Sequence, residues 1–259
     1  MQAFNYLASS SVAEASKAAA AGAKLIAGGQ SLLPMMRLGF ALPESLVDLA
    51  LIAELKGIQV KGGVVRIGAM STHAEVAAST EVKKAIPALA DLAGKIGDRQ
   101  VRNRGTLGGS LANADPAACY PAAALGLGAT IHTNSRDIVA DDFFKGLYET
   151  ALKDDELITA VSFPIPEKAG WQKFKQAASR FALVGVFVSK GPKGVRVAVT
   201  GAAGHVFRAT HLEQRLATNY SAAALEGASV PAKGLSSDLH GSAEYRAALI
   251  PVLAARAVG

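Results

Sequence analysis

Two short segments with paired glycines limit most strongly how this sequence can fold. Residues 27–31 read Ala-Gly-Gly-Gln-Ser, and residues 106–110 read Thr-Leu-Gly-Gly-Ser. We name them the first and the second glycine segment. Because glycine lacks a Cβ and tolerates positive φ, the backbone at such a step can approach a bulky anion and aim its N–H groups at it. Two such segments, far apart in the chain, predict one ligand with two phosphates.

Neither segment matches the usual nucleotide motifs. The Gly-Lys-Ser/Thr ending of nucleoside triphosphatases is missing, and so is the three-glycine spacing of dinucleotide-binding βαβ units. The first segment follows an apolar strand-like stretch, residues 24–27, and precedes a helix-compatible stretch, residues 32–38. A third pair, Gly62-Gly63, lies between two short apolar runs and is predicted to form only a hairpin turn.

Composition excludes several classes of protein. Of 259 residues, 50% are hydrophobic and 19% are charged, which predicts an ordered protein of two or three compact units. The net charge of +6 is scattered apart from Arg99, Arg102 and Arg104, so we expect no nucleic-acid binding. Those three arginines are expected in a loop, residues 97–105, where they support either the anion site or a subunit contact.

The single cysteine, Cys119, excludes an internal disulfide and a cysteine-ligated iron–sulfur or zinc site in this chain. It indicates a reducing, cytoplasmic location. No signal peptide is expected, and prolines and glycines interrupt the least polar run, residues 116–131, so stable membrane insertion is not expected either. The five histidines are dispersed without ligand spacing, and we assign no metal ligand.

The chain is predicted to be α+β with three units: residues 1–53, 54–167 and 168–259. Ser11 with Glu14 and Thr72 with Glu75 have the spacing of capping boxes. Pro164 and Pro166 mark the second boundary. The expected strands are residues 24–27, 45–49, 58–60, 64–67, 129–133, 157–163, 172–178, 182–189 and 194–200; the expected helices follow Ser11 and Thr72 or cover residues 32–38, 88–96, 121–127, 210–217, 221–226 and 242–258.

Three motifs in order carry a resemblance to a known family. They are Ala-Gly-Gly-Gln-Ser-Leu-Leu-Pro at 27–34, Gln-Val-Arg-Asn-Arg-Gly-Thr-Leu-Gly-Gly-Ser at 100–110 and Ala-Asp-Pro-Ala at 114–117. The chain resembles the FAD-binding medium subunits of molybdenum hydroxylases, the family of the aerobic carbon monoxide dehydrogenase medium subunit and the xanthine dehydrogenase FAD-binding subunit. The resemblance implies a vanillyl-alcohol-oxidase (PCMH)-type fold, with two α/β subdomains and a C-terminal domain of an antiparallel sheet and helices.

The same resemblance implies which residues bind FAD. The glycine segments would hold the pyrophosphate, and Phe181 falls near the isoalloxazine ring. Asp115 is expected mainly as a turn-former. Many relatives have Asp or Glu where this chain has Cys119, and a thiol is a poor acceptor for cofactor hydroxyls. The implied FAD-binding residues are Ala27, Gly28, Gly29, Gln30, Ser31, Leu32, Ile96, Thr106, Leu107, Gly108, Gly109, Ser110, Asp115, Ile158, Lys175 and Phe181.

The resemblance implies an electron-transfer flavoprotein with no catalytic residue of its own. A large subunit with the molybdenum cofactor would oxidise the substrate, and a small subunit would relay electrons through two [2Fe–2S] clusters to FAD on this chain. The implied assembly is a dimer of heterotrimers. Two alternatives stay open: a stand-alone FAD-dependent oxidase or dehydrogenase of the same fold, which needs a base near the flavin, and a non-catalytic FAD-binding assembly protein.

Overall fold

The computed structural model describes residues 2–259 and shows three larger sheets in succession along the chain, with a further sheet of two short strands. At the N-terminal end, three parallel strands form a sheet in the order β1-β3-β2. Helices α1 (Val12–Ala20) and α2 (Leu32–Arg37) connect them. The strands are β1 (Asn5–Ala8), β2 (Lys24–Ile26) and β3 (Ser45–Asp48), and the short helix η1 (Ala53–Leu55) leads onward.

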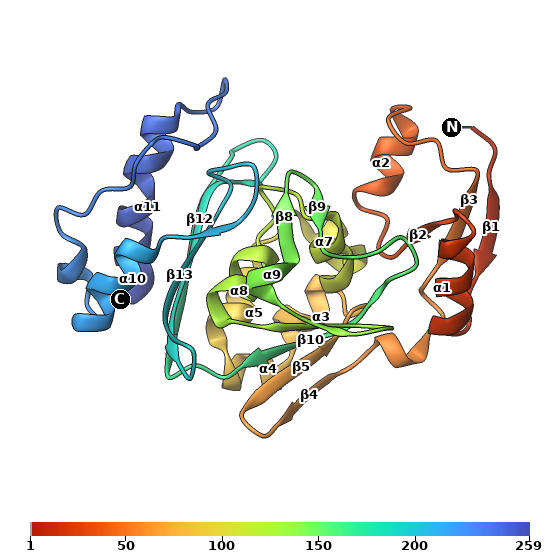
Figure 1. Ribbon diagram of the computed structural model, residues 1–259, viewed down its shortest axis with the longest axis horizontal. Helices are drawn as coiled ribbons and strands as arrows, with labels where there is room; N and C mark the ends of the chain where they lie inside the picture. Colours follow the sequence, from red (N-terminus) through yellow and green to blue (C-terminus); the bar gives the residue numbers. More distant parts are fainter. Residues whose placement is uncertain (1) are drawn as a thin grey trace.

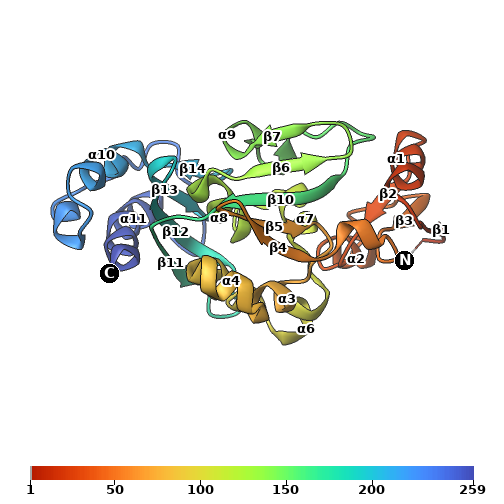
Figure 2. The ribbon, with the colours of Figure 1, turned by 90° about the horizontal axis from the view of Figure 1, so that it is seen from below.

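The middle of the molecule holds a five-stranded antiparallel sheet in the order β4-β5-β10-β6-β7. Figure 2 shows these strands side by side, with α3, α4 and α6 along one side. The strands are β4 (Ile58–Lys61), β5 (Val64–Gly68), β6 (Thr130–Thr133), β7 (Asp137–Val139) and β10 (Ile158–Pro164); the helices are α3 (His73–Ala78), α4 (Thr80–Ala85), α5 (Pro87–Gly94), α6 (Arg99–Arg104), α7 (Leu107–Asn113), α8 (Tyr120–Leu127) and α9 (Ala140–Phe143), and β8 (Phe144–Gly146) pairs with β9 (Glu149–Thr150).

The C-terminal part is a four-stranded antiparallel sheet, β11-β12-β13-β14, covered by helices. Figure 1 shows α10 and α11 on its outer side. Among residues 2–259, no helix is both long and apolar enough to cross a lipid bilayer. The elements are β11 (Lys168–Lys175), β12 (Ala182–Gly191), β13 (Gly194–Thr200), β14 (Phe207–Arg208), α10 (Thr210–Thr218), η2 (Ala222–Leu225) and α11 (Ala243–Val258).

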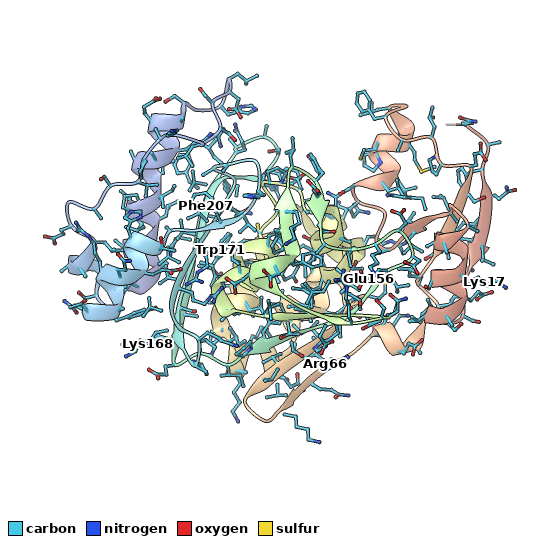
Figure 3. All side chains as sticks on the ribbon, viewed as in Figure 1. Lys17, Arg66, Glu156, Lys168, Trp171 and Phe207 are labelled. Atoms are coloured by element: carbon cyan, nitrogen blue, oxygen red, sulfur yellow. The ribbon has the colours of Figure 1, made fainter. Side chains whose placement is uncertain are left out.

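Helix α8 joins the second and third sheets into one core. All its residues are buried, because it packs against β10 on one side and against β12 and β13 on the other. A helix that is apolar all round is expected in such a position. Trp171 and Phe187 of the third sheet pack in the same cluster as Tyr120 and Phe163. Figure 3 shows Trp171 at this junction.

Several local predictions are confirmed. Thr72 and Glu75 form a complete capping box, and Gly62 and Gly63 turn the β4–β5 hairpin with φ of 59° and 74°. Ser11 caps α1 by accepting a hydrogen bond from the Glu14 N–H, but the Glu14 carboxylate accepts from the Ser10 N–H instead of completing the box.

Two predictions about residues 97–110 are wrong. The expected loop contains helix α6, because the Asp98 carboxylate accepts a hydrogen bond from the Val101 N–H and so caps a helix start. The second glycine segment, which we expected as a loop around a phosphate, begins a helix. Thr106 is the N-cap of α7, and Gly108 and Gly109 lie in the first helical turn. Strand β1 was not expected from the sequence.

Candidate functional site

The first glycine segment presents a run of free backbone donors. It connects β2 to α2, and Gly29 has a φ of 71°. Within residues 2–259, no N–H group from residue 28 to residue 32 donates to an acceptor of the chain, and Ser31 at the start of α2 makes no side-chain cap. Successive unpaired N–H groups at a helix start form a concave anion-binding site. This segment therefore has the geometry of a phosphate cradle.

The second glycine segment differs, since its own N–H groups are engaged. Leu107 and Gly108 donate to the carbonyls of Ser71 (3.0 Å) and Ala69 (2.8 Å). Gly109 donates to Thr106 Oγ1 at 3.1 Å, and Ser110 donates to the Thr106 carbonyl at 3.0 Å. The expectation that both segments present unpaired N–H groups thus holds for the first segment only. The second segment is instead held in place by these hydrogen bonds and forms one side of the candidate site.

The two segments lie side by side, and their glycines make this possible. A Cβ on Gly28 would collide with the carbonyl of Arg104 and with Gly105, directly before the second segment. A Cβ on Gly109 would lie 2.9 Å from Thr106 Oγ1 and 3.4 Å from Ala27 Cβ. The glycines therefore serve the contact between the segments as well as any approach to a ligand. Arg104 itself is exposed.

Asp115 forms the turn after α7. Its Oδ1 accepts a hydrogen bond from the Ala117 N–H at 2.8 Å, which confirms the predicted turn role. Its Oδ2 accepts a hydrogen bond from the hydroxyl of Tyr148, at 3.2 Å, in the β8–β9 turn. Ala114 and Tyr148 both have positive φ, 45° and 55°. Such strain in non-glycine residues concentrates at functional sites, so we count this turn as part of the candidate site.

A further part of the site gathers Ile96, Lys175 and Phe181. Lys175 ends β11, and Phe181, which is 50% exposed, precedes β12. The connection between these strands lies against the end of α5, because Arg180 Nη1 donates to the carbonyl of Gly97 at 3.4 Å. Cys119 is buried nearby, and burial raises the pKa of its thiol, which therefore stays protonated. The structure brings these distant residues together.

Ile158 is placed differently from the other predicted residues. Its side chain is 5% exposed and packs in the central core. The next residue, Thr159, accepts a hydrogen bond from the Ala69 N–H, and Ala69 in turn accepts one from Gly108. Only the backbone around Ile158 is thus connected to the second glycine segment. That Ile158 is an FAD-contacting position stays a prediction.

Three side chains on the five-stranded sheet resemble a hydrolase triad that the sequence did not indicate. His132 Nδ1 lies 2.6 Å from Asp137 Oδ1, and its Nε2 lies 2.7 Å from Ser162 Oγ. Ser162, however, belongs to the central strand β10, which is paired on both sides by β5 and β6. Acyl transfer needs free donors for an oxyanion beside the nucleophile, and the paired strand does not supply them.

The comparisons with known proteins decide the family. A family model described as the FAD binding domain in molybdopterin dehydrogenase matches residues 2–166. The chain belongs to this family. Its medium-subunit relatives include the nicotine 6-hydroxylase medium subunit of Paenarthrobacter nicotinovorans, which is 40% identical over 249 residues that cover 91% of this chain and 88% of the relative. The carbon monoxide dehydrogenase medium chain of Hydrogenophaga pseudoflava is 35% identical over 252 residues, with the same coverage.

Solved structures agree with this assignment. Carbon monoxide dehydrogenase from Hydrogenophaga pseudoflava matches with a TM-score of 0.88 and 35% identity, and covers 99% of this chain and 96% of that one. Quinoline 2-oxidoreductase from Pseudomonas putida 86 matches with a TM-score of 0.89 and 33% identity over the same shares. The predicted family and the PCMH-type α+β fold are confirmed. The protein is an FAD-binding medium subunit, the flavoprotein component of an oxidoreductase.

Proposed function

We propose that this medium subunit holds FAD through the first glycine segment and transfers electrons from an iron–sulfur partner to an external acceptor. The observation that carries the proposal is the run of free N–H groups from residue 28 to residue 32, set against the backbone of Arg104 and Gly105. FAD, when bound, supplies the redox chemistry. The N–H groups fit its diphosphate, because unpaired backbone donors at a helix start bind phosphate oxygens.

The remaining predicted residues complete the proposed site. Thr106, Leu107, Gly108, Gly109 and Ser110 form the wall beside the diphosphate, and Asp115 fixes the adjoining turn. Ile96, Lys175 and Phe181 flank the proposed position of the isoalloxazine ring. The proposed division at residue 167 falls between the end of β10 at Pro164 and the start of β11 at Lys168, and the proposed division at residue 53 falls on the first residue of η1.

The chemistry of the site favours electron transfer over a stand-alone oxidase. A stand-alone enzyme needs a base that reaches a substrate at the flavin. Asp115 is committed to two hydrogen bonds, and the Cys119 thiol is protonated and buried. His73 lies behind the second segment, 5% exposed, and burial lowers its pKa to about 4. These groups hold the backbone in place and leave substrate oxidation to another chain.

The relatives also support the proposal that this chain transfers electrons while another subunit oxidises the substrate. Their names refer to nicotine, carbon monoxide and quinoline, yet their medium chains or structures match this chain over most of its length. We therefore propose that the substrate is chosen by a large subunit with a molybdenum cofactor and that a small iron–sulfur subunit delivers the electrons. The proposed assembly is a dimer of these heterotrimers in the cytoplasm.

Native purification of the chain, followed by addition of a reducing substrate, tests this proposal. We expect a yellow protein that purifies with two partner chains, and a flavin that is bleached by the substrate only when both partners are present. Rapid bleaching of the isolated chain by an alcohol or aldehyde would support the stand-alone oxidase instead. A colourless chain that cannot be loaded with FAD would support the assembly protein.

A further inference from the structure

Lys173 on β11 makes contacts that no motif in the sequence indicates. Its Nζ donates to the carbonyl of Lys95 at 2.6 Å and to the carbonyl of Arg180 at 3.1 Å, and lies 3.5 Å from Cys119 Sγ. An ammonium group has three donors, so these contacts use all of them. The three partners belong to the end of α5, the β11–β12 connection and the start of α8. One side chain thus joins three segments that are distant in sequence.

Two of the three contacts adjoin a residue of the candidate site. Lys95 immediately precedes Ile96, and Arg180 immediately precedes Phe181. Arg180 has a φ of 63°, a conformation that is unfavourable for a side chain with a Cβ and has to be held by its surroundings. Its carbonyl is held by Lys173, and its N–H donates to the carbonyl of Gln176 at 2.9 Å. Lys173 therefore helps to fix the connection that ends in Phe181.

The position of Lys173 on its strand is itself rigid. Side chains alternate between the faces of a strand, so Lys173 lies on the same face as Trp171, which is 3% exposed and packs in the central core. The register between β11 and β12 shifts just beyond, between Phe174 and Lys175. Lys173 is anchored just before this register shift, so it can fix the backbone that follows the shift, from Lys175 into the β11–β12 connection.

We propose that Lys173 is a positioning residue for bound FAD, which acts by fixing residues 176–181 against the end of α5. It would act through Ile96, Lys175 and Phe181, without touching the cofactor. The inference rests on the proposed function, since it assumes that these three residues flank the flavin. Removal of the ammonium should therefore alter the surroundings of the flavin while the diphosphate cradle of the first glycine segment remains.

The test uses the full chain loaded with FAD, as wild type and as the variants Lys173→Met, Lys173→Arg and Lys84→Met. Lys84 is an exposed lysine of α4 and serves as the matched control. We expect all four proteins to bind one FAD per chain. Lys173→Met should change the visible circular dichroism of the flavin, and trypsin should cleave it after Arg180 about tenfold faster, because a charge-assisted hydrogen bond no longer limits local opening. Lys173→Arg should restore most of both properties.

An unchanged flavin spectrum and cleavage rate in Lys173→Met would overturn the inference, and so would a Lys173→Arg variant that behaves like Lys173→Met. Absence of FAD from the wild type would instead overturn the proposed function, so the two failures are distinguishable. If Lys173→Met does not fold, Lys173→Gln takes its place. We then expect the flavin signal to decrease from wild type to Arg to Gln, and equal signals would overturn the inference.

Discussion

At the residue scale, Gly28 is needed for a packing contact that the sequence alone does not reveal. The sequence suggested that its missing Cβ admits an anion. In the structure the missing Cβ faces the carbonyl of Arg104. A side chain here would push the two glycine segments apart, and the free N–H groups of the first segment would no longer lie against the second.

We expect Gly28→Ala to weaken FAD binding by about tenfold or more, because a displacement of the segments costs at least the energy of one charge-assisted hydrogen bond. Equilibrium binding of FAD to the purified chain measures the effect. Gly204→Ala is the matched control, since a Cβ on Gly204 meets nothing within 4 Å. Equal affinities of the two variants would show that contact between the segments is not required.

His73 gives a pH-dependent prediction. Its pKa is lowered from 6.5 to about 4, mainly because burial disfavours the charged ring and also because Arg102 is near. The unfolded chain therefore takes up the proton first as the pH falls. The contribution of neutral His73 to stability is complete above pH 6.5 and is lost between pH 6.5 and about 4, by about 3 kcal/mol in total.

Urea unfolding of wild type and His73→Leu across this pH range measures that loss. We expect the variant to lack the corresponding part of the decline in unfolding free energy, whatever its stability at neutral pH. His240→Leu, at an exposed position, should keep the full decline. A His73→Leu variant with the wild-type slope would contradict the assignment of the buried neutral ring.

At the scale of elements, Arg196 fastens β13 to the middle of the molecule. It is 5% exposed; its Nε donates to the carbonyl of Leu125 in α8 at 2.7 Å, and its Nη2 donates to both carboxylate oxygens of Asp141 in α9, at 2.6 and 2.7 Å. Bidentate pairs of this kind fix geometry as well as charge. The second and third sheets are thereby held in one arrangement around α8.

We expect Arg196→Met to lower the free energy of unfolding by about 2 kcal/mol, since it removes a buried charged donor. Among residues 2–259, the Leu125 carbonyl then keeps only the Gly128 N–H at 3.2 Å, and Asp141 keeps only Arg208 Nη1 at 3.3 Å. Lys190→Met is the control, because Lys190 forms an exposed pair with Glu167 at 3.6 Å, and such pairs contribute about 0–1 kcal/mol. Chemical denaturation of both variants measures the difference. A loss in Arg196→Met no larger than in Lys190→Met would show that this contact does not fasten the sheets.

The elements also show which parts of the fold the sequence predicts. Signals made by neighbouring residues are sufficient to predict a local structure. The Thr72–Glu75 capping box and the Gly62-Gly63 hairpin are two such predictions, and both are confirmed. Strand β1 was missed because all four of its residues are exposed, so no alternation marks it. Helix α6 was missed because the polar stretch resembles a loop, and only the Asp98 cap reveals its start.

In the candidate site too, local features could be predicted from the sequence, whereas contacts between distant segments could not. Paired glycines and their helix starts are local features, and they predicted the first glycine segment correctly as a helix-preceding bend. The hydrogen bond from Tyr148 to Asp115 and the contacts of Lys173 join segments that only the folded chain brings together. The loss of free donors in the second segment likewise depends on Ala69 and Ser71, which lie outside every motif.

At the scale of the whole molecule, the five-stranded sheet lies between the N-terminal sheet and the C-terminal sheet (Figure 1). In the proposed site, the segment after β2 would supply the N–H donors, α7 would lie beside the diphosphate, and the β11–β12 connection would lie beside the flavin ring. All three non-glycine residues with positive φ, among residues 2–259, adjoin the turn or the connection: Ala114, Tyr148 and Arg180. The strained positions of the chain thus concentrate where the flavin is proposed to lie.

A crystal structure of the full chain with bound FAD tests the role of the first glycine segment most directly. We expect oxygens of the FAD diphosphate within hydrogen-bonding distance of the N–H groups between residues 28 and 32, with Gly28 still packed against Arg104. A diphosphate bound elsewhere on the chain, while these N–H groups face solvent, would contradict the proposed site.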